Sequence, residues 1–163
     1  MNNEPAMTTN IKSSKRTVLS TVGQMFDPLG LVNPCILQGK IILQRLWGAK
    51  VSWDSPLPTE IEKDWLLFLN YLPHINNITI PRHMICNSPT RIELHAFSDA
   101  SNLAYSACIY LRSISIDGST AVHLVMAKSK VAPLQGMTTP RLELSGALLA
   151  VRTPEKDEVA AQG

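Results

Sequence analysis

One stretch of the chain reads Glu93-Leu94-His95-Ala96-Phe97-Ser98-Asp99-Ala100-Ser101, and a second reads Pro140-Arg141-Leu142-Glu143-Leu144-Ser145-Gly146-Ala147-Leu148-Leu149-Ala150. The first predicts a hydrophobic strand that ends at a carboxylate, Asp99. The second predicts a helix on which Glu143 shares a face with Gly146, Ala147 and Ala150, and such small residues let a helix lie close against a sheet. Two carboxylates that converge in a fold have to share a cation or a proton, because unpaired buried charge is very costly. Asp99 and Glu143 are therefore the candidate site.

Each carboxylate also has an ordinary structural explanation. Aspartate is common where a strand ends and a turn begins, as at Asp99. Glutamate near a helix start is favoured by the helix macrodipole, as at Glu143. The pair in its context is more informative than either residue alone.

The residues between these two segments predict further strands. The first strand is expected over 91–98, a second over 104–113 and a third over 121–129, with a turn at Asp117-Gly118. The helix is expected from Pro140 with Thr139 as its N-cap. Pro154 predicts an interruption of this helix near Arg152. The order is β-β-β-α.

The upstream sequence has a helical pattern. Ser14 is the expected N-cap of a helix over 15–26, Asn33-Pro34 the expected N-cap and N1 of a second, and Thr59 with Glu62 a capping box that opens a third helix through about Tyr71. A short strand is expected at 78–80. The expected organisation is a disordered N-terminus (1–14), a helical segment (15–75), a linker (76–90), the β-β-β-α unit (91–152) and a disordered tail (153–163). The fold class is α+β, with an α/β-like half-domain.

Composition sets limits on the function. The chain has 163 residues, 45% hydrophobic and 17% charged, which suits a globular core. A net charge of +2 gives no broad basic field for nucleic acid, and three scattered cysteines indicate neither a zinc site nor a disulfide framework. The first residues lack a signal-peptide layout, and no apolar run approaches the roughly 18 residues of a membrane span. We expect an intracellular protein without a membrane partner, whether cytoplasmic or nuclear.

Several motifs occur together in a recognisable order. The second half holds Phe97-Ser98-Asp99-Ala100-Ser101, then Ala127-Lys128-Ser129-Lys130-Val131-Ala132-Pro133-Leu134, then Thr139-Pro140-Arg141-Leu142-Glu143-Leu144. These segments resemble the ribonuclease H-like part of the Pol polyprotein of Bel/Pao long-terminal-repeat retrotransposons. Upstream, Lys15-Arg16-Thr17-Val18-Leu19-Ser20, Phe26-Asp27-Pro28-Leu29-Gly30-Leu31 and Leu46-Trp47 are similar to the region that follows the reverse-transcriptase palm in the same polyproteins. The resemblance covers roughly residues 12–152.

The resemblance implies roles for the candidate site. In the ribonuclease H family, the Asp that ends the first strand and the Glu of the first helix are metal ligands, and they correspond here to Asp99 and Glu143. A pair of divalent cations, normally Mg²⁺, is held by these and further carboxylates and hydrolyses the RNA strand of an RNA–DNA hybrid. The implied partners are therefore an RNA–DNA hybrid or the remaining Pol segments. The helical segment would correspond to a thumb- or connection-like region.

The sequence also departs from the family pattern. The family's third acidic ligand ends a fourth strand after the helix, whereas here Thr153-Pro154 follows and no hydrophobic strand presents Asp157 or Glu158. The reverse-transcriptase Asp-Asp motif is absent upstream. We therefore expect a truncated ribonuclease H-like unit that does not cleave hybrids by itself.

Other functions are weighed against this one. An aspartic peptidase needs Asp-Thr-Gly or Asp-Ser-Gly, and the chain offers only Asp54-Ser55-Pro56 and Asp117-Gly118-Ser119, so peptidase activity is not expected. A domesticated module that binds nucleic acid or protein without catalysis is the alternative. Lys128, Lys130 and Arg141 are candidates for phosphate contacts, against their simpler interpretation as solvated charges.

Overall fold

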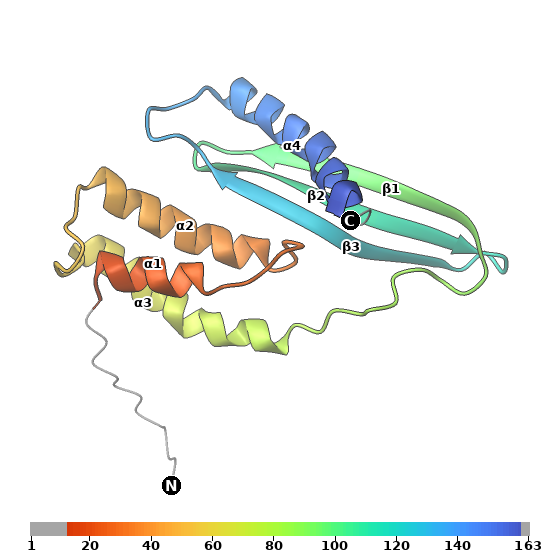
Figure 1. Ribbon diagram of the computed structural model, residues 1–163, viewed down its shortest axis with the longest axis horizontal. Helices are drawn as coiled ribbons and strands as arrows, with labels where there is room; N and C mark the ends of the chain where they lie inside the picture. The colour runs from red at the N-terminus through yellow and green to blue at the C-terminus, as the bar shows by residue number, and fades with distance from the viewer. Residues whose placement is uncertain (1–12, 161–163) are drawn as a thin grey trace, which may run out of the picture.

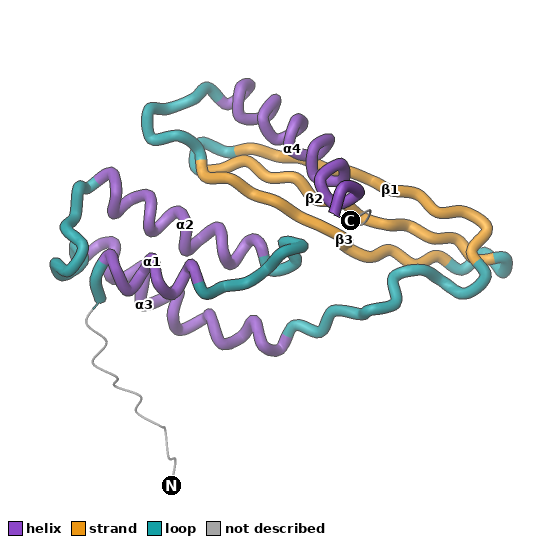
Figure 2. The backbone as a smooth tube through the Cα atoms, in the orientation of Figure 1, coloured by secondary structure: helices purple, strands orange, loops and turns teal. Residues whose placement is uncertain are grey.

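The computed structural model describes residues 13–160, with side chains through residue 153. Two groups of elements make up the fold: three N-terminal helices beside β3, and a sheet with α4 across one of its faces (Figures 1 and 2). In chain order the elements are α1 (Lys15–Gly23), α2 (Asn33–Gly48), α3 (Thr59–Tyr71), the 3-10 helix η1 (Leu72–Asn77), β1 (Pro89–Ala100), β2 (Ala104–Ser115), β3 (Thr120–Val131) and α4 (Thr139–Ala160). The α+β class and the β-β-β-α order are confirmed. No helix in the described part of the chain is long and apolar enough to cross a membrane.

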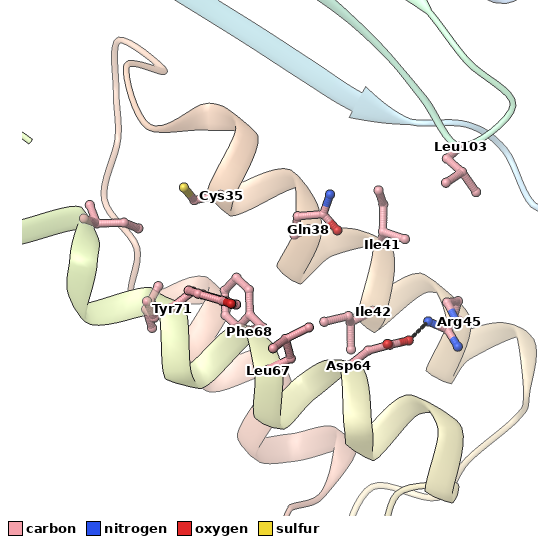
Figure 3. A pocket seen from close by; sticks show the side chains of 12 residues that line it. Cys35, Gln38, Ile41, Ile42, Arg45, Asp64, Leu67, Phe68, Tyr71 and Leu103 are labelled. Carbon is pink, nitrogen blue, oxygen red and sulfur yellow. Dashed lines mark hydrogen bonds and ion pairs between the residues drawn. The ribbon is translucent and has the colours of Figure 1, made fainter.

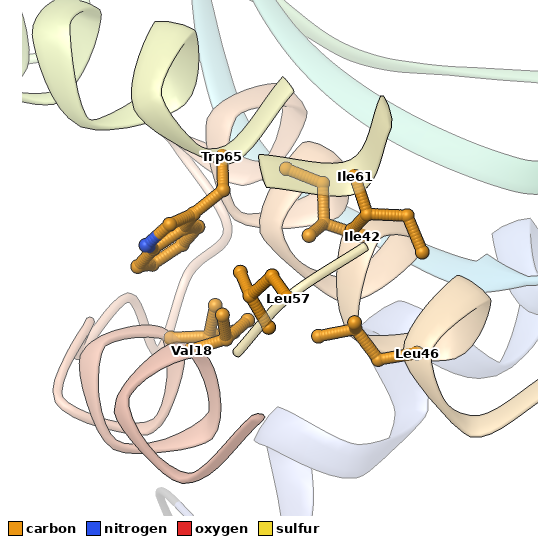
Figure 4. Close-up of a cluster of buried hydrophobic side chains, with 7 residues drawn as sticks. Val18, Ile42, Leu46, Leu57, Ile61 and Trp65 are labelled. Carbon is orange, nitrogen blue, oxygen red and sulfur yellow. The ribbon is translucent and has the colours of Figure 1, made fainter. Parts of the chain in front are cut away.

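The N-terminal helices surround a core of their own. Trp65 of α3, Leu46 of α2 and Val18 of α1 are almost completely buried, and Leu57 before α3 closes the cluster (Figure 4). Figure 4 shows these side chains pointing toward one another from different elements. A single helix of this length is marginal in water, so the burial of apolar side chains in this shared cluster stabilises all three helices.

The start of α1 agrees with the sequence. Ser14 is its N-cap, and the Ser14 hydroxyl accepts a hydrogen bond from the Thr17 amide while the Thr17 hydroxyl accepts one from the Ser14 amide. This reciprocal arrangement satisfies two amides that the helix leaves free. The helix ends at Gly23, three residues before the expected Phe26.

Three local expectations upstream of the sheet are wrong. Asn33 is the first residue of α2 rather than its cap, because its side chain accepts instead from the Ser129 hydroxyl of β3. Thr59 and Glu62 form no capping box: Pro58 occupies the N-cap position without a side-chain bond. Thr59 is thus already helical, and the Pro58 carbonyl accepts the first bonds of α3, from the amides of Ile61 and Glu62. Residues 78–80 form no strand, since no neighbouring strand pairs with them.

Asp27 supplies the cap that α2 lacks at its own N-cap position. Its two carboxylate oxygens accept hydrogen bonds from the amides of Leu31 (2.9 Å) and Val32 (3.0 Å), just before α2 begins. A carboxylate at this place satisfies free amides and complements the positive end of the helix dipole.

We expect Asp27→Ala to lower the free energy of unfolding by about 1–2 kcal/mol, as for the loss of a helix cap. Asp27→Asn keeps one acceptor oxygen and should lose about half as much. Urea denaturation followed by circular dichroism measures both. Equal stability of Asp27→Ala and the unaltered chain would show that these two bonds contribute nothing.

The sheet has the order β1-β2-β3 with antiparallel pairs. Each strand is longer than expected: β1 covers the predicted 91–98, β2 the predicted 104–113 and β3 the predicted 121–129. Among the described residues β1 pairs only with β2, so its other edge carries unpaired backbone groups.

Helix α4 packs on β1 and β2 with a narrow buried stripe. The buried residues recur at helical spacing: Leu142, Gly146, Ala150 and Thr153. The helix continues to Ala160, so the predicted interruption at Pro154 is wrong. A proline removes one backbone bond and bends a helix without having to end it, and buried Thr153 keeps this part of α4 on the sheet. Of the expected disordered termini, residues 1–12 and 161–163 lie outside the described residues.

The helical group is joined to the sheet along β3. The Leu29 carbonyl accepts from the Ala127 amide (2.8 Å), the Ser129 hydroxyl donates to Asn33 (2.8 Å), and the Gln44 amide donates to the Ala132 carbonyl. These contacts give β3 a partner on its outer edge, which removes one aggregation-prone edge.

Candidate functional site

Asp99 lies one residue before the end of β1. It is exposed and stands opposite Ser106 of β2. One of its carboxylate oxygens accepts from the next amide, that of Ala100, at 2.8 Å. This is the strand-end role that aspartate ordinarily has, and it leaves the second oxygen free of protein partners among the described residues.

Glu143 lies in the early part of α4 and is exposed. Within the described residues it forms no hydrogen bond or ion pair. Of its predicted small neighbours, Gly146 and Ala150 are buried on the sheet and Ala147 is exposed. Two of the three predicted small residues therefore pack on the sheet, and Glu143 lies beside this packed face and not within it.

Gly146 marks where α4 crosses the backbone of Asp99. A Cβ placed on Gly146 would lie 3.4 Å from the carbonyl oxygens of both Asp99 and Ser106. Helix α4 thus crosses β1 and β2 directly over this residue pair. Glu143 precedes Gly146 by three residues, which is about 4.5 Å along a helix axis, so it lies within one turn of the crossing.

The strand pleat determines how Asp99 and Glu143 can meet. The Ser98 Cβ lies 3.5 Å from the same Cβ position on Gly146, so Ser98 faces α4. Side chains alternate along a strand, and Asp99 therefore starts on the face turned away from α4. A cation shared by the two carboxylates would have to sit at the end or the open edge of β1.

The donor set is that of a hard cation. Two carboxylates offer oxygen ligands, which suit Mg²⁺ or Mn²⁺, and Mg²⁺ usually keeps several waters beside one or two protein carboxylates. In the described part of the chain no group of three or more His, Cys, Asp or Glu side chains could hold a metal. The chemistry of the two side chains, though not a measured distance between them, therefore suits a partly hydrated Mg²⁺.

A second charged cluster, which the sequence did not reveal, lies on β1 and β2. Glu93 forms ion pairs with Arg91, His95 and Arg112. The hydrogen bond from His95, then that from Arg112, lowers the pKa of Glu93 below its usual value. The spacing of Arg91, Glu93 and His95 at every second residue was a usable signal, because it places all three on one face of a strand.

The candidate phosphate contacts are spread over two elements. Lys128 and Lys130 pair with Ala107 and Tyr105, on the face of the sheet that carries α4. Lys130 and Arg141 are exposed and Lys128 is half-buried. Between the two lysines, Ser129 points the other way to bind Asn33.

A cavity between α2 and α3 was also not foreseen. It measures about 620 Å³ and is lined mainly by apolar side chains, among them Ile42, Leu67, Phe68 and Tyr71. Figure 3 shows the ion pair of Arg45 with Asp64 at one end of this space. Leu103, from the turn between β1 and β2, also lines it, so the cavity faces the sheet as well as the helices (Figure 3).

The β-β-β-α unit, with acidic residues at the end of its first strand and the start of its helix, is consistent with a truncated ribonuclease H-like domain. Residues 14–158 match the family of the Pao retrotransposon-like RNaseH-like domain, and the chain belongs to this family. The resemblance drawn from the sequence is thereby confirmed. Neither the curated proteins nor the solved structures include a significant match.

Proposed function

We propose that this chain contributes Asp99 and Glu143 to a Mg²⁺-dependent site that acts on the RNA strand of an RNA–DNA hybrid. The observation that carries the proposal is the packing of Gly146 on the backbone carbonyls of Asp99 and Ser106, which places Glu143 within one helical turn of the point where α4 crosses the backbone of Asp99. Membership in a ribonuclease H-like family supports the choice of substrate class.

Asp99 and Glu143 would each supply carboxylate oxygens to the proposed site. Asp99, fixed through its bond to the Ala100 amide, would bind Mg²⁺ with its free oxygen. Glu143, exposed and unpartnered among the described residues, would bind the same ion at the open edge of β1. Bound divalent cations supply an activated water and stabilise the leaving oxygen in phosphodiester hydrolysis.

Two carboxylates provide few protein ligands for a pair of divalent cations. With Asp99 and Glu143 as the only protein ligands, we infer weak Mg²⁺ binding and no hybrid cleavage by this chain alone. A labelled RNA–DNA hybrid incubated with the chain and Mg²⁺ should stay intact. Turnover that disappears in Asp99→Asn would contradict the inferred inactivity and would support the site itself.

Mn²⁺ serves as the probe of the site, because it takes the oxygen ligands of Mg²⁺ and broadens nearby NMR signals. We expect selective broadening of the amide signals of Ala100 and Leu144, and loss of this effect in Asp99→Asn and in Glu143→Gln. Mg²⁺ at ten times its dissociation constant should stabilise the unaltered chain by about 1.4 kcal/mol. The same variants should abolish that gain.

Glu62→Gln is the matched control, because Glu62 is also near a helix start and lies outside the β-β-β-α unit. It should leave the broadening pattern unchanged. Broadening that persists in both site variants, or that centres on Glu62, would contradict a shared site at Asp99 and Glu143.

A further inference from the structure

The face of β1 and β2 turned away from α4 carries an ordered row of side chains. Alternation places Arg91, Glu93, His95 and Phe97 on this face with Asp99. Their neighbours across the strand pair are Arg112 opposite Glu93 and Tyr110 opposite His95. The contacts agree with this placement, since Arg112 pairs with Glu93 and the ring of Phe97 contacts that of Tyr110.

An aromatic pair lies in the middle of this row. The Phe97 side chain is large and apolar, yet the residue is 58% exposed. Its ring meets Tyr110 edge-on, with centroids 6.0 Å apart and planes at 76°. An edge-on contact leaves ring surface uncovered, and exposed aromatic rings on a sheet are platforms on which nucleobases stack.

Basic side chains surround Glu93 at the start of this row. The Glu93 side chain is only 18% exposed, whereas the side chains of Arg91, His95 and Arg112 around it are 41–68% exposed. Solvent therefore meets two guanidinium groups and an imidazole above a covered carboxylate. Asp99 lies on the same face, two residues from Phe97 and about 7 Å from it along the strand, so Phe97 stands between the arginines at one end of the row and an exposed carboxylate at the other.

We propose that this face binds single-stranded nucleic acid, with a base stacked on Phe97 and phosphates on Arg91 and Arg112. Arg112 stands opposite Glu93, and Arg91 lies further toward the start of β1, so a single strand that follows β1 would place a base on the Phe97 ring and the phosphates of other nucleotides on the two guanidinium groups. The binding needs no divalent cation, so it is independent of the site proposed at Asp99 and Glu143.

The test is fluorescence anisotropy of the full chain with labelled oligo(dT) and oligo(rU), at low salt and with EDTA. We expect binding of both, weakened about tenfold by Phe97→Ala, as for the loss of one stacked base. Phe97→Leu keeps the apolar bulk without the aromatic face, and it should lose as much affinity as Phe97→Ala. An unchanged melting temperature of Phe97→Leu would exclude a folding defect as the cause. Arg91→Gln should flatten the dependence of log affinity on log salt by about 0.7, the value for one phosphate contact on a single strand.

Leu94→Ala is the matched control, since Leu94 lies on the opposite face of the same strand and is 63% exposed. It should leave the affinity unchanged. Glu93→Gln removes the covered carboxylate and should strengthen binding. The proposal is overturned by the absence of binding, by equal effects of Phe97→Ala and Leu94→Ala, or by an effect of Phe97→Ala on self-association in place of oligonucleotide binding. Loss of Mn²⁺ broadening at Ala100, in contrast, would leave it intact.

Discussion

Gly30→Ala is expected to lower the free energy of unfolding by about 4 kcal/mol or more, a size that single substitutions reach only through a specific steric or backbone fault. Gly30 has a φ of +74°, and a Cβ at this position would lie 1.7 Å from the Ala127 carbonyl oxygen of β3. The obstacle is backbone inside a paired strand, so it cannot rotate away. The turn must lift off β3 and lose the bond from the Ala127 amide to the Leu29 carbonyl.

Comparison with Gly118→Ala separates the two causes of the lost stability, which are the steric clash with β3 and the strain of a left-handed backbone. Gly118 has a similar φ of +84°, but nothing lies within 4 Å of its Cβ position. Only the left-handed backbone strain remains there, about 1–2 kcal/mol. Urea denaturation of both variants gives the difference, and hydrogen exchange should show the Ala127 amide exposed in Gly30→Ala alone. Equal losses in the two variants would mean that the turn does not rest on β3 as described.

The same contact shows which parts of the fold the sequence could predict. Strand alternation, turn residues and the Ser14 cap are local signals, and the elements that depend on them form where expected. In the sequence, Asp27-Pro28-Leu29-Gly30 has the composition of a turn and indicates no more than that for Gly30. Its close approach to Ala127, 97 residues away, follows from the packing of α2 on β3, which no local pattern encodes.

The two predicted N-caps that are wrong, Asn33 and Thr59, show the same limit of local patterns. Asn33 and Thr59 both have good capping side chains, but Asn33 binds Ser129 of β3 instead, and α3 begins one residue earlier than predicted, with Pro58 at the N-cap position. Asp27, which does cap α2, lies too far from the helix for the usual capping pattern. Capping preferences are worth about 1 kcal/mol, so a tertiary contact of similar strength can shift a boundary by a residue.

The sequence indicates which residues form the candidate site, but it says less about how their side chains are placed relative to one another. Small residues after Glu143 predict close packing on a sheet, and the position of Gly146 over Asp99 and Ser106 agrees. Which face Asp99 takes depends on which side of β1 receives α4, and the sequence does not specify that side. The Glu93 cluster was missed because Arg112 comes from a different strand.

Trp65→Ala should be the second most damaging substitution, with a loss of about 3–5 kcal/mol in the free energy of unfolding. Trp65 is 1% exposed and stacks on Phe68 with ring centroids 5.3 Å apart. It contacts the cluster that holds α1, α2 and α3 together (Figure 4), so the cavity would open at the junction of three elements. Leu66→Ala, at the exposed neighbouring position, should change stability by no more than about 0.5 kcal/mol.

Trp65→Phe distinguishes the contribution of volume from that of the indole N–H. The Nε1 of Trp65 is buried without a hydrogen-bond partner among the described residues, and an unsatisfied buried donor costs about 1–3 kcal/mol. Phenylalanine removes this donor and keeps a ring against Phe68, so its smaller volume is partly offset. We therefore expect Trp65→Phe to retain most of the stability that Trp65→Ala loses, as measured by urea denaturation of the three chains side by side. A loss as large as that of Trp65→Ala would mean that the Nε1 is satisfied in solution and that the whole indole is required.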